Sequence, residues 1–142
     1  MKLLAALVLG AVAIGGCASV GGREREDRVV YHIEDTASQA SSALRYIRNQ
    51  LEVDPKAKIV VVAHARGVDF LLKGAHDANG NPYGVPVEDL AFLGVKFEVC
   101  EITLRERGLA RAQFVPDATF VPSGVAEIVR LQQREGYAYL RP

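Results

Sequence analysis

Lys58-Ile59-Val60-Val61-Val62-Ala63 is the most apolar strand-like stretch of the chain, and it decides the fold. Its β-branched residues favour a strand. Every position after Lys58 is apolar, so the strand is expected to be buried on both faces, which is typical of the centre of a parallel sheet. We therefore predict a parallel sheet with helices on both faces and with this strand in its middle.

On either side of this stretch, the chain alternates between strands and helices. Further apolar runs with the length and composition of strands lie at residues 28–33, 95–100, 118–121 and 137–140. Helical patterns separate them. Strands that alternate with helices at this spacing specify an α/β fold. We predict a single domain whose sheet is five-stranded, parallel and doubly wound.

Two of the predicted helices carry specific expectations about their ends and faces. Thr36 and Gln39 have the spacing of a capping box at the start of the first helix, and Ser123 is placed to cap the last one. Apolar spacing predicts which side chains face the sheet. These are Ala40, Leu44, Ile47 and Leu51 in the first helix, and Val125, Ile128, Val129 and Leu131 in the last.

Residues 1–17 have the features of a secretory signal peptide. Lys2 is followed by an apolar or small run that is too short to span a membrane. The run ends in Ile14-Gly15-Gly16-Cys17, which resembles a bacterial lipobox, so Cys17 is expected to be lipidated and to become the mature N-terminus. Ordinary cleavage near Ala18, with Cys17 discarded, is the alternative. Either route predicts a periplasmic or cell-envelope protein whose membrane contact is at most a lipid anchor.

Residues 18–27 are small or charged and are expected to form a tether, which leaves residues 28–142 as the folded domain. About 120 residues are enough for one domain with a core of its own. The full chain has 17 basic and 17 acidic residues, and the predicted leader contains a single charge. A domain without net charge has no field to attract nucleic acid, so no nucleic-acid partner is expected.

Cys100 is the only cysteine of the predicted domain, because Cys17 belongs to the leader. It follows a strand in which Val95, Phe97 and Val99 alternate with polar residues, so the thiol is expected on the polar face. A helix that begins at about Thr103 would lower the pKa of the thiol. A single cysteine in an exported domain serves as a working thiol, an intermolecular link or a buried apolar residue.

Ligands bind at the carboxyl ends of the strands in parallel sheets. The side chains expected at this edge include Cys100 and His64 as candidate catalytic residues, and Arg66, Thr103 and Ser123 as candidate ligand-binding residues. Each has a plainer alternative: His64 as a loop cap, Arg66 as a solvated charge, Ser123 as a helix cap.

No cofactor or metal site is predicted. The sequence contains no phosphate-binding glycine loop, dinucleotide-binding motif or Cys-x-x-Cys pair. Its histidines, His32, His64 and His76, lie in different segments, so a metal site would need them to converge in the fold.

The pair Val99-Cys100, the helix end Arg107-Gly108 and the stretch Val121-Pro122-Ser123-Gly124 make the domain resemble the DsrE/DsrF-like sulfur-relay proteins. Further matching stretches are Val29-Val30-Tyr31-His32, Asp77-Ala78-Asn79-Gly80 and Leu131-Gln132-Gln133. The resemblance runs from Val29 to Pro142 and is greatest to the envelope-targeted members of the family.

The resemblance implies a YchN-like α/β fold that assembles into a homo-oligomer, a trimer or a hexamer. It also implies that Cys100 accepts sulfur as a persulfide and passes it on, with a sulfur donor or acceptor protein as partner. The protein is therefore interpreted as an envelope sulfur carrier. The alternative is a non-catalytic oligomeric module that binds a ligand or partner and in which Cys100 is structural.

Overall fold

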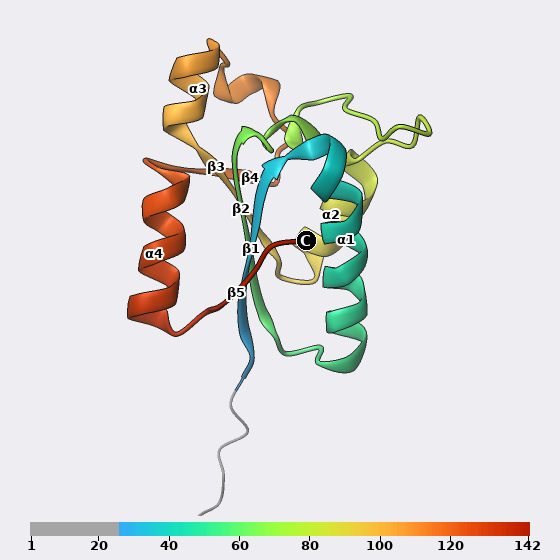
Figure 1. Cartoon of the computed structure of the whole chain (residues 1–142). Coiled ribbons are helices and arrows are strands. Elements are labelled where there is room, and N and C mark those ends of the chain that lie inside the picture. The colour runs from blue at the N-terminus through green and yellow to red at the C-terminus, as the bar shows by residue number, and fades with distance from the viewer. Residues whose placement is uncertain (1–25) are drawn as a thin grey trace, which may run out of the picture.

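The computed structural model describes residues 26–142, in which five parallel strands form one sheet in the order β4-β3-β2-β1-β5 (Figure 1). The predicted doubly wound parallel sheet is confirmed, and the stretch 58–63 does lie in its central strand. The strands are β1 (Arg28–Asp35), β2 (Lys58–Arg66), β3 (Lys96–Cys100), β4 (Ala118–Val121) and β5 (Ala138–Leu140).

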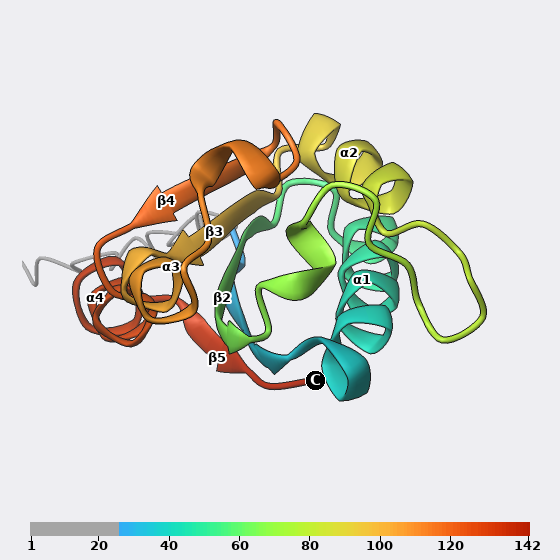
Figure 2. The ribbon, with the colours of Figure 1, turned by 90° about the horizontal axis from the view of Figure 1, so that it is seen from above.

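Helices cover both faces of the sheet. In the view from above, α1 and α4 lie on opposite sides of the strands, with α2 beside α1 and α3 over the carboxyl edge (Figure 2). The helices are α1 (Thr36–Val53), α2 (Gly84–Phe92), α3 (Glu101–Arg107) and α4 (Gly124–Glu135), with two short 3₁₀ turns, η1 (Asp69–Leu71) and η2 (Arg111–Gln113).

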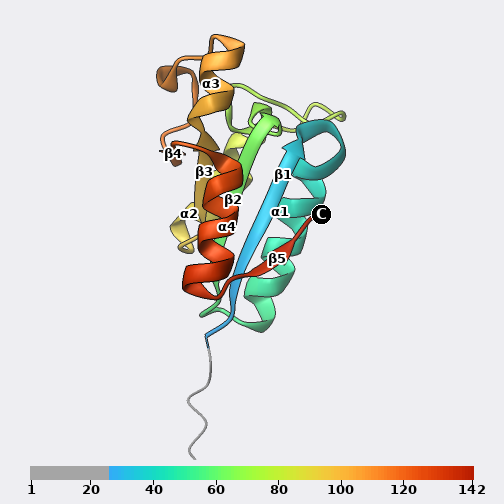
Figure 3. The same ribbon diagram turned by 60° about the vertical axis from the view of Figure 1, so that its left-hand side comes forward.

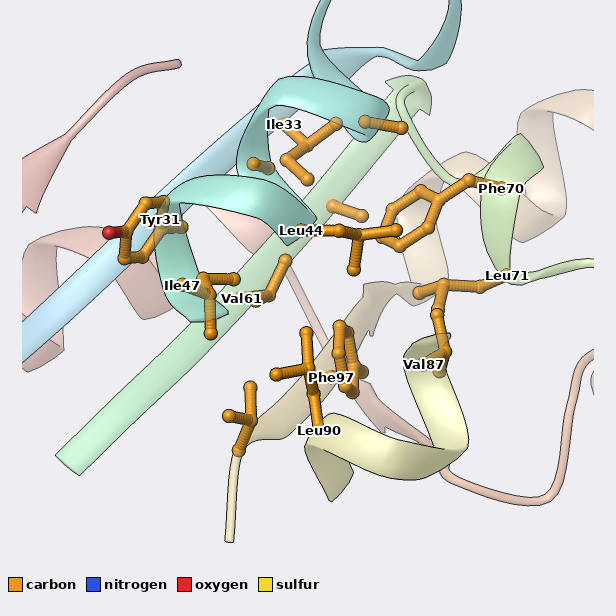
Figure 4. Packing of buried hydrophobic residues seen from close by; sticks show 14 of the residues in the cluster. Tyr31, Ile33, Leu44, Ile47, Val61, Phe70, Leu71, Val87, Leu90 and Phe97 are labelled. Atoms are coloured by element: carbon orange, nitrogen blue, oxygen red, sulfur yellow. The ribbon is translucent and has the colours of Figure 1, made fainter. Parts of the chain in front are cut away.

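The larger part of the core lies between the sheet and the pair α1 and α2 (Figure 4). The stripe predicted for α1 is buried in it at all four positions. Burying a leucine or isoleucine contributes about 1.5–3 kcal/mol, so this stripe accounts for most of the attachment of α1 to the sheet. The smaller part, on the α4 face, consists of Val30, Val60, Val62, Ile128 and Leu131.

The face predicted for α4 is only half correct. Ile128 and Leu131 are buried, but Val125 is 58% exposed and Val129 is 47% exposed. The helix contacts the sheet along Gly124, Ile128 and Leu131, which are spaced by four and three residues. Because each residue turns the helix by about 100°, the two valines, one position further along, point away from the sheet.

The N-terminal cap of α1 also differs from the prediction. Asp35, not Thr36, is the cap: its carboxylate accepts from the backbone N–H of Ser38. Gln39 does close the turn, since its amide oxygen accepts from the backbone N–H groups of Glu34 and Asp35. The hydroxyl of Thr36 instead donates to the carbonyl of Arg66 and so joins α1 to the end of β2. The capping serine of α4, Ser123, is as predicted and accepts from Ala126 N–H.

The chain ends beside the carboxyl edge of the sheet, where β5 runs along β1 (Figure 3). The side-chain amide of Gln39 donates to the carbonyl of Pro142 over 3.2 Å, which holds the last residue against the start of α1.

The predicted signal peptide 1–17, the lipidation site Cys17 and most of the tether 18–27 lie outside the described residues. Within residues 26–142, no helix has the length and apolar character needed to cross a membrane.

Candidate functional site

Cys100 lies where β3 meets α3, at the carboxyl edge of the sheet. It is the last residue of β3 and the N-cap of α3, with extended backbone angles (φ −71°, ψ 117°). The helix begins at Glu101, two residues earlier than predicted. The thiol therefore lies directly at the start of the helix, where backbone N–H groups have no partner within the helix.

The thiol is more buried than the alternation of β3 indicates. Phe97 and Val99 face the α1 and α2 side as predicted, and Cys100 lies on the opposite face with Glu98. That face is not open, because α4 covers it, and Cys100 is only 5% exposed. The expectation of a thiol on a polar face is wrong in this respect: a sequence alternation shows which face a residue is on, but not what packs against that face.

Polar groups near the sulfur of Cys100 lower the pKa of its thiol. Burial raises this pKa, but the backbone N–H groups of Gly124, Thr103 and Ile102 and the hydroxyl of Thr103 lower it by more, so the pKa is lower than usual. Each of these donors stabilises the thiolate more than the neutral thiol. Two helix starts, those of α3 and α4, thus meet at one sulfur.

Gly124 allows the start of α4 to lie close to Cys100. A Cβ at this position would stand 3.2 Å from the Cβ of Cys100, and 3.4 Å from both the Cβ of His64 and a methyl of Val62. These distances are tighter than normal carbon contacts, so a side chain here would move the backbone N–H away from the sulfur. Glycine is needed at Gly124 for close approach, not for an unusual backbone angle.

Thr103 supports the site from within. It is 4% exposed, and its hydroxyl accepts from the backbone N–H of Ala65 over 2.9 Å. Ala65 has a positive φ of 48°, an unfavourable conformation for an L residue, and Arg107 also holds it by donating to its carbonyl. Thr103 was a candidate ligand-binding residue; the structure places it under the thiol, joined to the end of β2.

His64 is beside Cys100 but is hydrogen-bonded elsewhere. The strand register pairs Ala63 with Val99, so the next residues, His64 and Cys100, are neighbours on the α4 face. The Nε2 atom of His64 lies 2.6 Å from the Nε2 atom of His32, on the next strand. The Nδ1 atom of His32 lies 2.7 Å from the hydroxyl of Tyr139 on β5.

Sequence reasoning missed His32 and Tyr139. The sequence does carry a signal for His32. Side chains on one face of a strand recur at every second residue, and His32 pairs with Val62, two residues before His64, so both histidines lie on the same face of the sheet. This signal can be recognised only when the register of β1 against β2 is known. His76, by contrast, lies in the loop before α2 and bridges to Pro82.

Arg66 and Ser123 take different places. Arg66 is paired with Asp35 over 2.7 Å and lines a cleft of about 520 Å³ together with Glu34 and Arg141, on the α1 side of the carboxyl edge. Ser123 is the N-cap of α4 and directly precedes Gly124. The structure therefore gathers His64, Thr103 and the start of α4 around Cys100, while Arg66 belongs to the neighbouring cleft.

No cluster of three or more His, Cys, Asp or Glu side chains that could hold a metal ion occurs within residues 26–142. The chemistry that the arrangement can support is that of a thiolate: nucleophilic attack by sulfur, with an imidazole at hand for the proton.

The fold and the site define a single-domain parallel α/β protein with one thiol at the carboxyl edge of its sheet. The model of the DsrE/DsrF-like family matches residues 27–142, and the chain belongs to that family, which is linked to sulfur relay.

Solved structures that are similar to the chain include the following two. The protein of unknown function MTH1491 from Methanobacterium thermoautotrophicum is 34% identical, with a TM-score of 0.73, over 82% of this chain and all of that one. The ychN protein from E. coli has a TM-score of 0.68 over 82% of this chain and 99% of its own, and at 13% identity it shows the shared fold alone. No curated protein matches the chain.

Proposed function

We propose that this protein is an envelope sulfur carrier in which Cys100 accepts a sulfane sulfur as a persulfide and passes it to an acceptor protein. One observation carries the proposal: Cys100 lies at the start of α3 and against Gly124 at the start of α4, and the backbone N–H groups of Gly124, Thr103 and Ile102 lower the pKa of its thiol despite burial. Membership of a family linked to sulfur relay supports the same reading.

The chemistry needs only the thiolate and a donor persulfide. The thiolate of Cys100 attacks the outer sulfur of the donor, a new sulfur–sulfur bond forms at Cys100, and the bond between the donor's two sulfurs breaks. The donor leaves as a thiolate, so no net oxidation occurs.

Isolation of the thiol suits a carrier. Cys100 is the single cysteine of residues 26–142 and is free. A second cysteine nearby would attack the persulfide, release the sulfur and form a disulfide. The described domain contains no such residue, so a bound sulfur would stay until an acceptor thiol reaches it.

The test is to incubate the full chain with a persulfide donor and to measure the mass of the peptide that contains Cys100. A gain of one sulfur that dithiothreitol removes is expected, with Cys100→Ser as the negative control. Absence of the gain under conditions that load a control thiol protein would contradict the proposal.

The burial of Cys100, at 5% exposure, favours a second candidate: a non-catalytic module in which the cysteine is structural. The cleft beside Arg66 and Asp35 would then hold the ligand. Cys100→Ser separates the two candidates, because a binding module keeps its assembly and its ligand affinity, whereas a carrier loses sulfur uptake.

We further propose export to the envelope, with lipidation at Cys17, and assembly into a homo-oligomer, a trimer or a hexamer. Support for assembly comes from apolar side chains on and beside α2 that are exposed in the single chain: Phe92 (91%), Leu93 (59%) and Val85 (59%). Light scattering of the wild type and of Phe92→Glu tests the assembly. The intact mass of protein recovered from membranes tests the lipid.

A further inference from the structure

Two histidines of adjacent strands meet edge to edge next to the thiol. The rings of His32 and His64 are within 25° of parallel with centroids 4.8 Å apart, and their closest atoms are the two Nε2 nitrogens, at 2.6 Å. Such a contact is an N–H···N hydrogen bond in which one ring donates and the other accepts. The two rings therefore share one proton between their Nε2 atoms.

Tyr139 extends the pair towards solvent. Its hydroxyl lies 2.7 Å from Nδ1 of His32, and its side chain is 43% exposed. A continuous chain of hydrogen bonds thus runs from His64, which neighbours Cys100, through His32 to an exposed hydroxyl. Each link joins groups that can both donate and accept, as a path for protons requires.

The surroundings keep this pair from holding a second positive charge. Burial lowers the pKa of His32, and the charges of His64 and Arg141 lower it further, against the opposite effect of Glu34. Arg141 is itself paired with Glu34. From β3, the carboxyl group of Glu98 faces the same side of the sheet as His64, and burial followed by repulsion from Glu127 of α4 raises its pKa to about 7.

We propose that His64, His32 and Tyr139 form a proton relay that accepts the proton of the Cys100 thiol and delivers it to solvent. The proposal rests on the function proposed above, because sulfur transfer requires the thiol to lose a proton and the relay is the group that accepts it. His64 is the acceptor, and His32 is a positioning residue that acts through it.

The transfer balances without oxidation or reduction. In the tautomer in which His64 Nε2 donates to His32 Nε2, the other nitrogen of His64, Nδ1, is free to accept. The S–H bond of Cys100 breaks, its electron pair stays on sulfur, and the proton moves, directly or through one water, to His64 Nδ1. The Nε2 proton of His64 passes to His32, the Nδ1 proton of His32 passes to the Tyr139 oxygen, and the former hydroxyl proton leaves to water. The reverse path protonates the thiol again.

Alkylation of Cys100 against pH tests the relay. The full chain is treated with iodoacetamide in the presence of EDTA, and the peptide that contains Cys100 is measured by mass spectrometry. The variants are His64→Gln, His32→Gln and Tyr139→Phe, and the matched control is His76→Gln, the same change outside the site. Nitrogen-15 NMR of the wild type records the tautomer of each histidine.

For the wild type we expect a histidine inflection in the profile and opposite Nε2 protonation states in His32 and His64. His64→Gln should remove the inflection and lower alkylation at pH 7 at least roughly tenfold, because the thiol then has no neighbouring base to accept its proton. His32→Gln should act in the same direction, Tyr139→Phe should have a smaller effect, and His76→Gln none. Profiles of His64→Gln and His32→Gln that coincide with the wild type would overturn the relay, as would protonation of both Nε2 atoms in neutral wild-type protein.

Sulfur loading of the same proteins separates the relay from the proposed function. If the wild type takes up sulfur while the histidine variants keep its alkylation profile, the relay is wrong and the carrier function stands. If the profiles shift as expected but no sulfur is taken up, the relay stands as a means of activating the thiol and the carrier function is wrong. Should a variant fail to fold, the NMR measurement on the wild type still decides the sharing of the proton.

Discussion

Replacing Gly124 with alanine should raise the pKa of Cys100 while leaving the fold intact. The added Cβ would stand 3.2 Å from the Cβ of Cys100 and 3.4 Å from that of His64, so α4 must shift by a few tenths of an ångström. That shift moves the backbone N–H of Gly124, which lowers the pKa of the thiol, away from the sulfur. A hydrogen bond to a charged group contributes about 1.5–3 kcal/mol, and losing about 1.4 kcal/mol of it corresponds to a pKa rise of about one unit.

The effect on stability should be small by comparison. Overpacking costs about 1–3 kcal/mol, and alanine in place of glycine in a helix returns roughly 0.5–1 kcal/mol. The net loss is therefore about 0–2 kcal/mol, measured by urea unfolding. The thiolate fraction at pH 7 should fall about tenfold, measured as the rate of iodoacetamide alkylation of Cys100 against pH.

Gly84→Ala is the matched control. Gly84 is the first residue of α2, as Gly124 is of α4, and a Cβ there would meet nothing within 4 Å. It tests the general effect of alanine at a helix start without touching the thiol. An unchanged pH profile in Gly124→Ala, or an equal change in Gly84→Ala, would refute the view that the close approach of α4 activates Cys100.

Three further predictions concern residues around the site. Gly67→Ala should prevent stable folding, with a loss above roughly 4 kcal/mol in urea unfolding, because its Cβ would lie 2.1 Å from the carbonyl oxygen of Ile33. Thr103→Val should cost about 1–3 kcal/mol by leaving Ala65 N–H unpaired, and it should raise the pKa of Cys100, while Thr103→Ser keeps both properties. Glu98→Gln should stabilise the protein at pH 8 but not at pH 4: burial raises the pKa of Glu98 to about 7, so the folded state holds a proton that the unfolded state loses, and stability falls as pH rises from about 4.5 to 7. The gain at pH 8 should be about 1 kcal/mol after discounting for solvent screening of this partly buried group, and equal unfolding curves for both proteins at that pH would contradict it.

Local composition was sufficient to predict most of the architecture. The continuous apolar run 58–63 became the central strand, and the stripe of α1 is buried at every predicted position. Both are properties of a strand or helix by itself, so periodicity reports them directly. Helix caps were less predictable, because Asp35 and Thr36 are both suitable capping residues and the choice depended on Thr36 reaching Arg66 across the fold.

The chain by itself determined which face of the sheet each residue of the site takes, and that Cys100 stands at the end of its strand. Only the tertiary structure decided what lies against that face. The approach of α4 buries the thiol and supplies the N–H of Gly124, and the register of β1 on β2 brings His32 to His64. These contacts join residues far apart in sequence, and their distances depend on how whole elements pack, which no local pattern encodes.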